Sequence, residues 1–88
     1  MYYVYVLKCK AEKSSDLYIG STADLKERLK DHKTKSVSTT KKFVDVELVY
    51  YEACNDKSDA LIREKQLKTG FGRGYIKRRL KNDMAMRD

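Results

Sequence analysis

Four aromatic or charged side chains in the N-terminal part of the chain have the types and spacing of a phosphate-handling site. Tyr5 and Tyr18 stand thirteen residues apart in strand-like segments, and Arg28 and His32 stand four apart, on one face of a predicted helix. Each buried phenol needs a hydrogen-bond partner, so two of them are costly in an ordinary core. The guanidinium fork matches phosphate oxygens, and histidine titrates near neutral pH. We therefore expect an anion-binding group with a titratable neighbour.

Glu64 is the one carboxylate that falls on the apolar face of a predicted helix. It follows Leu61 by three residues and precedes Leu67 by three, so it projects with the buried stripe. A buried carboxylate must be paired or metal-bound. Position alone leaves two interpretations equal: a core salt bridge to Arg28 or a nearby lysine, or a ligand of one Mg²⁺ or Mn²⁺ ion. A single inward carboxylate favours one hard cation over a two-metal site.

The other candidates also have plainer interpretations, which spacing alone favours. Arginine on a helix is most often exposed, a lone histidine at a helix end is more often structural than catalytic, and strand tyrosines usually pack. The glycines of Thr-Gly-Phe-Gly-Arg-Gly resemble a phosphate loop only weakly, because no strand precedes them and no Lys-Ser/Thr follows. Helix termination at Gly70 and a turn are the expected outcome.

The charge balance favours a polyanionic partner. The 88 residues carry 20 Lys+Arg against 13 Asp+Glu, a formal net charge of +7. Such a surface attracts nucleic acid in a salt-dependent way, although many basic domains are merely well solvated. The candidates for nucleic-acid contacts are Lys8, Lys33, Lys35, Lys41, Lys42, Arg73, Lys77, Arg78, Arg79 and Lys81.

The length predicts one domain over residues 1–82, with 83–88 as a frayed tail. No apolar run approaches the roughly 20 residues of a membrane span, and no leader resembles a signal peptide, so we expect a cytoplasmic protein without a membrane partner. Cys9 and Cys54 are too few for a zinc site or a disulfide framework, and we interpret both as small buried thiols.

The elements that must position these residues form a small α+β architecture. Residues 2–9 are apolar on both alternating faces and should be a central strand; 17–20 and 44–51 are the other strands. Ser21 and Asp24 predict a cap for a helix over 22–33. Asp56 or Ser58 predicts the start of a helix ending near 69, with a stripe of Ala60, Leu61 and Leu67, and residues 75–81 form a short basic helix. The order is therefore β-β-α-β-α-α.

With these elements in place, the motifs resemble the GIY-YIG nuclease family, and most of all its small stand-alone bacterial members. The matching residues, in order and spacing, are Tyr3-Val4-Tyr5, Tyr18-Ile19-Gly20, Ser21-Thr22, Leu25, Arg28, His32 and Glu64. The resemblance implies a three-stranded antiparallel sheet flanked by helices and a phosphodiesterase that uses one Mg²⁺ or Mn²⁺ ion. By this analogy Tyr18 activates water, Arg28 stabilises the phosphate, Glu64 holds the metal, and Tyr5 and His32 complete the hydrogen-bonded set. A tyrosine base needs cations nearby, which Arg28, the metal and lysines such as Lys8 would supply.

Three departures from the family pattern bear on this analogy. Tyr3 stands where the first motif has glycine, Ser21 follows Gly20 where some repair members carry lysine, and only Asn82 is near the place of the family's late asparagine. We expect an endonuclease of limited sequence specificity acting on nucleic acid, DNA in preference to RNA, with a protein partner as one source of specificity. The alternatives are a non-catalytic nucleic-acid-binding module and an accessory subunit that cleaves only with a partner.

Overall fold

The computed structural model describes residues 1–35, 37 and 40–82, and the predicted tail at 83–88 lies outside them. The elements occur in the predicted order. They are β1 (Tyr2–Lys10), β2 (Ser15–Thr22), α1 (Leu25–Lys33), β3 (Asp45–Cys54), α2 (Lys57–Leu67) and α3 (Gly70–Arg79).

The three strands form an antiparallel sheet with the order β2-β1-β3, which confirms β1 as the central strand. A central strand is covered on both faces, and Val4 to Cys9 are all buried. The register pairs Tyr5 with Gly20 and Leu7 with Tyr18. Since paired residues lie on the same face of a sheet, Tyr5 and Tyr18 face the same side.

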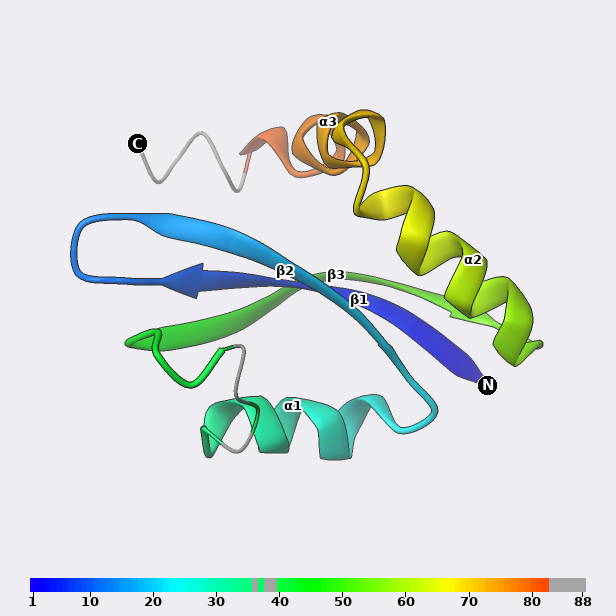
Figure 1. The fold of residues 1–88 in the computed structure, drawn as a ribbon, viewed down its shortest axis with the longest axis horizontal. Helices are drawn as coiled ribbons and strands as arrows, with labels where there is room; N and C mark the ends of the chain where they lie inside the picture. The colour runs from blue at the N-terminus through cyan, green and yellow to red at the C-terminus, as the bar shows by residue number, and fades with distance from the viewer. Residues whose placement is uncertain (36, 38–39, 83–88) are drawn as a thin grey trace.

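Helices cover both faces of the sheet (Figure 1): α1 lies on one side, and α2 and α3 lie on the other. Leu25 and Leu29 of α1 pack against a cluster that includes Tyr5, Leu7 and Cys9. On the opposite face, helical Ala60, Leu67 and Ile76 pack against Val4, Val6, Leu17 and Ile19. The fold is α+β, as predicted, and the site residues are distributed over both layers.

The start of α1 and the buried stripe of α2 differ from the prediction. Ser21 and Thr22 belong to β2, and α1 is capped by Asp24 alone, whose carboxylate accepts from the Glu27 N–H at 3.1 Å. The paired strand continues through the predicted cap because β1 extends far enough to pair with both residues. In α2 the Asp56 cap is confirmed, but Leu61 is 43% exposed and does not join the buried stripe.

Helix α3 begins at Gly70, not at residue 75, so the glycine-rich segment is helical. Thr69 caps it by accepting the Gly72 N–H at 3.0 Å. A Cβ at Gly72 would collide with the Gln66 carbonyl, so glycine lets the first turn of α3 pack directly on the end of α2. Glycine is a poor helix former in isolation, and this close packing overrides its propensity.

Cys9 is buried and Cys54 is partly buried, both as free thiols. None of the helices in the described part of the chain is long and apolar enough to cross a membrane.

Candidate active site

Tyr5 is the centre of a hydrogen-bonded group on the α1 face of the sheet. Its side chain is fully buried, and its hydroxyl lies 2.9 Å from Nε2 of His32. Arg28 Nε donates to the same oxygen at 3.3 Å. Arg28 and His32 reach Tyr5 together because they lie one turn apart on α1, on the side that faces β1.

The second ring nitrogen of His32 is held by Thr40, a residue that none of the sequence motifs indicated. Nδ1 of His32 lies 2.8 Å from the Thr40 hydroxyl, and both side chains are 1% exposed. Which ring nitrogen of His32 donates depends on its tautomer, and in either tautomer both nitrogens have a hydrogen-bond partner, Tyr5 at Nε2 and Thr40 at Nδ1. The sequence signal was general: a buried histidine requires two partners.

Burial favours the uncharged forms of Tyr5 and His32, so Arg28 carries the charge in this hydrogen-bonded group. It raises the pKa of Tyr5 to about 12, although the hydrogen bond from Arg28 opposes the rise. Burial and the Arg28 charge lower the pKa of His32. The pKa of Arg28 is raised, chiefly by its hydrogen bond to Tyr5 and to a smaller extent by Tyr18. At neutral pH Tyr5 therefore keeps its proton, and neither Tyr5 nor His32 presents an exposed side chain to solvent.

Tyr18 lies beside this group but opens to a cavity. Its ring centroid is 5.0 Å from that of His32 and 6.2 Å from that of Tyr5, and the side chain is only partly buried. Gly20 follows at the position that pairs with Tyr5, where a Cβ would lie 2.7 Å from the phenol oxygen. Only glycine leaves room for both tyrosines, which explains the Tyr18-Ile19-Gly20 motif physically.

The cavity at Tyr18 has a volume of about 360 Å³ and is lined by cations from three segments. Lys42 comes from the segment before β3, Lys68 is the C-cap of α2, and Arg73 comes from α3. Asp16 is a lining residue as well. Cationic groups around a cavity concentrate anions and stabilise developing negative charge there.

Glu64 approaches from the other face of the sheet, next to β2. Its Oε1 accepts from the Ser21 hydroxyl at 2.7 Å, and its Oε2 lies 2.7 Å from Nζ of Lys68. These two partners outweigh partial burial and lower the pKa of Glu64, so the group is a carboxylate. Of the salt bridges expected from sequence, the one to a nearby lysine is present in this structure. Because β2 is an edge strand, Glu64 and Tyr18 both lie at this edge, and Lys68 is common to the surroundings of both.

The oxygen donors at Glu64 fit a single hard cation. Within the described residues there is no cluster of three or more His, Cys, Asp or Glu side chains that could hold a metal. Mg²⁺, however, is commonly bound by one or two carboxylates, with water and substrate phosphate completing the shell. The ammonium of Lys68 already places a positive charge at Oε2. Glu64 and Ser21 are thus the residues that would hold the ion.

The basic candidates fall into two groups. Lys8 is 1% exposed and projects by alternation to the face opposite Tyr18, so in this structure it neither lies on the surface nor faces Tyr18. The others are exposed, and Lys42 and Arg73 among them line the Tyr18 cavity. The exposed group is Lys33, Lys35, Lys41, Lys42, Arg73, Lys77, Arg78, Arg79 and Lys81. Asn82 is also exposed, beyond the end of α3.

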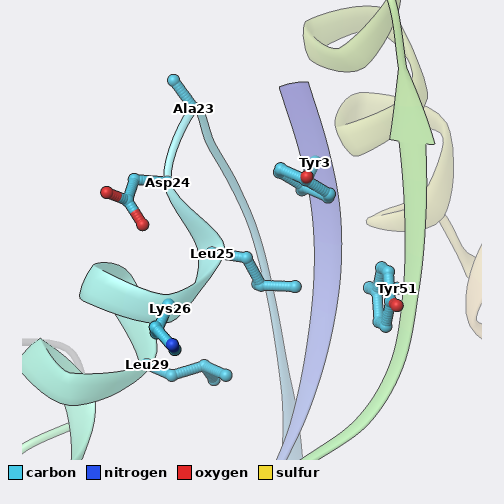
Figure 2. Close-up of a pocket in the computed structure, with 7 residues that line it drawn as sticks. All are labelled: Tyr3, Ala23, Asp24, Leu25, Lys26, Leu29 and Tyr51. Carbon is cyan, nitrogen blue, oxygen red and sulfur yellow. The ribbon is translucent and has the colours of Figure 1, made fainter. Parts of the chain in front are cut away.

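A larger cavity, of about 460 Å³, lies away from this site, between α1 and the β3 side of the sheet. Figure 2 shows Leu25 and Leu29 of α1 pointing toward Tyr3 of β1 and Tyr51 of β3. The two tyrosine rings meet edge to face, with centroids 6.1 Å apart. None of the candidate residues Tyr5, Tyr18, Arg28, His32 and Glu64 is among its lining residues.

Comparison with known proteins gives a match that covers almost the whole chain. Residues 1–82 match the family described as the GIY-YIG catalytic domain. A UPF0213 protein of Staphylococcus haemolyticus is 39% identical over 69 residues, which are 77% of this chain and 80% of that protein. A UPF0213 protein of Streptococcus agalactiae is 40% identical over 67 residues, 75% of this chain and 73% of the relative.

A third relative, a UPF0213 protein of Haloquadratum walsbyi, is 33% identical over 69 residues, 77% of this chain and 74% of that protein. The names of these three relatives state no activity. No solved structure gives a significant match.

Proposed function

This chain belongs to the GIY-YIG family, and we propose that it is a metal-dependent endonuclease that hydrolyses phosphodiester bonds in nucleic acid, DNA in preference to RNA. The observation that carries the proposal is the contrast between the two tyrosines. Tyr5 is buried and hydrogen-bonded to Arg28 and His32, whereas Tyr18 lines a cavity that is also lined by cationic side chains. A packed pair of strand aromatics would not require this division.

In the proposed reaction Tyr18 accepts a proton from the attacking water as the new phosphorus–oxygen bond forms, and the phosphorus–oxygen bond to the leaving group breaks. A tyrosine can do so only as a phenolate, which positive groups nearby stabilise. Lys42, Lys68 and Arg73 line the cavity with Tyr18 and supply that charge. Tyr5 and His32 are proposed to position the other groups: Tyr5 holds Arg28 by a hydrogen bond, and the ring of His32 packs against that of Tyr18.

Arg28 is proposed to stabilise the negative charge of the reacting phosphate. One of its five N–H donors is engaged by Tyr5, and Tyr18 also acts on its pKa, so the guanidinium lies close to both tyrosines. The remaining fork matches two phosphate oxygens. Glu64, supported by Ser21, is proposed to hold one Mg²⁺ or Mn²⁺ ion, and such an ion would neutralise charge on the leaving oxygen.

The test is cleavage of labelled duplex, flap, single-stranded and RNA substrates by the purified protein, with Mg²⁺, with Mn²⁺ and with excess chelator. Metal-dependent cleavage that is lost with Tyr18→Phe supports the proposal. Binding without cleavage of any substrate would favour the non-catalytic binding module. Cleavage that arises only when a cell extract is added would favour the accessory subunit, with specificity supplied by a protein partner.

A further inference from the structure

Lys68 connects the carboxylate of Glu64 to the cavity of Tyr18. Its ammonium lies 2.7 Å from Oε2 of Glu64, four residues earlier on the same helix. The same side chain lines the cavity that contains Tyr18, Lys42 and Arg73. The flexible side chain of Lys68 is therefore paired with the proposed metal ligand Glu64 and also borders the cavity in which the substrate phosphate is proposed to bind.

The ion pair is weak enough to exchange. The side chain of Lys68 is 52% exposed and that of Glu64 is 18% exposed, so the lysine end of the pair lies in solvent. Ion pairs spaced i, i+4 on a helix surface are favoured only about twofold over the separated, hydrated groups. A divalent ion attracts the carboxylate more strongly than an ammonium does, since it carries twice the charge. Lysine also has a long stem with many rotamers, so its head can move while its backbone stays in the α2 cap.

We propose that Lys68 is an exchangeable counterion, which neutralises Glu64 in the metal-free protein and is released to bind a substrate phosphate when Glu64 takes up a divalent cation. This inference rests on the proposed function, because it names the substrate phosphate and the ion of that same site. It makes Lys68 a phosphate-binding residue that couples the two ligands. By linkage, each ligand then strengthens the binding of the other.

The first experiment measures Mn²⁺ binding to the free protein by calorimetry, without nucleic acid. Lys68→Gln should bind Mn²⁺ about two- to fivefold more tightly than the parent, because a competitor for Oε2 has been removed. Lys65→Gln is the matched control, since it removes the same charge from the adjacent residue after Glu64 on the exposed side of α2. A Lys68→Gln affinity no higher than that of Lys65→Gln overturns the proposal.

The second experiment needs neither metal nor catalysis. In chelator, Glu64→Gln releases Lys68, so the slope of log affinity against log salt for duplex DNA should steepen by about 0.9, the value for one phosphate contact. The double variant Glu64→Gln/Lys68→Gln retains the loss of negative charge but should not show the steeper slope. Equal slopes in the single and double variants overturn the proposal.

These results are distinguishable from failure of the proposed function. A parent protein that cleaves no substrate and binds no Mn²⁺ would contradict the nuclease proposal and, with it, the metal exchange. Normal metal-dependent cleavage with unchanged affinities in the Lys68 variants would contradict the role of Lys68 alone.

Discussion

The phenol oxygen of Tyr5 lies 2.9 Å from Nε2 of His32, although the two residues are 27 positions apart and come from β1 and α1. The contact leaves neither group open to substrate, since Tyr5 is fully buried and His32 is 1% exposed. Tyr5 also accepts a hydrogen bond from Arg28, and the ring of His32 packs against that of Tyr18. The reactive phenol of the proposed mechanism is therefore Tyr18, and the expected effects of substitution differ sharply between the two tyrosines.

Tyr18→Phe removes the hydroxyl and retains the ring. We expect kcat to fall by about 10²–10⁴, the range for loss of a general base, while the free energy of unfolding changes by no more than about 0.5 kcal/mol. Single-turnover cleavage and thermal melting measure the two effects. The control is Tyr5→Phe, which leaves buried Nε2 of His32 without a partner and should cost about 1–3 kcal/mol of stability. His32→Ala reducing kcat far more than Tyr18→Phe would contradict the assignment.

Glu64→Ala and Glu64→Gln should abolish metal-dependent cleavage and preserve nucleic-acid binding. The ion pair to Lys68 is partly exposed, so its loss should lower stability by only about 0.5 kcal/mol. Cleavage assays, filter binding in chelator and melting curves separate the three effects. Glu12→Gln, at an exposed carboxylate in the β1–β2 turn, is the control and should be active. Full activity of either Glu64 variant, or of the parent protein in excess chelator, would rule out the one-metal mechanism.

Thr40→Val tests the hydroxyl that holds His32. The substitution keeps the shape of the side chain but leaves buried Nδ1 of His32 without its partner, which should cost about 1–3 kcal/mol of unfolding free energy. Nitrogen chemical shifts of the imidazole should also change, because they report which ring nitrogen carries the proton and that choice depends on the partner at Nδ1. Thr40→Ser retains the hydroxyl and should restore both properties. Identical imidazole spectra for Thr40→Val and the parent would show that Thr40 does not orient the ring.

The lowered pKa of His32 predicts a loss of stability in mild acid. An unfolded histidine titrates near 6.5, and the folded protein binds this proton more weakly. The contribution is therefore present above pH 6.5 and is lost as the pH falls from there through the folded pKa. His32 is the one histidine in the chain, so its imidazole signals can be followed by NMR without ambiguity. An imidazole pKa at or above 6.5 in the folded protein would contradict this prediction.

The basic end of α3 should contribute to affinity and not to turnover. Lys77, Arg78, Arg79 and Lys81 are exposed, so we expect them to bind backbone phosphates equally in the ground and transition states. Replacing all four by glutamine should reduce the salt slope of DNA binding by about 0.9 for each phosphate that the variant no longer neutralises, with kcat at saturating substrate nearly unchanged. Lys57→Gln, at the start of α2, is the control. A fourfold variant with the parent's slope would show that this helix end is only a solvated surface.

The alternation of apolar residues predicted β1 and its two covered faces, because side-chain direction in a strand follows from sequence parity alone. The Asp56 cap was equally local. The start of α3 could not be predicted from local sequence, because Gly70 to Gly74 are helical only where Gly72 packs on the Gln66 carbonyl. Local propensity describes an isolated segment, and this segment is not isolated.

For the site, the sequence by itself determined which side chains are candidates for the proposed chemistry: two tyrosines, the Arg28–His32 pair on one helix face, and Glu64 in α2. Only the tertiary structure decided which of these side chains are buried, as Tyr5 and His32 are, and which line a cavity, as Tyr18 does. The contacts of His32 with Thr40, and of Glu64 with Ser21, join segments eight and 43 residues apart. Such contacts depend on strand register and on how helices sit on the sheet, which residue types at fixed spacing do not specify. The same packing buried Lys8 and brought Lys68 to Tyr18, although both are lysines in a basic chain.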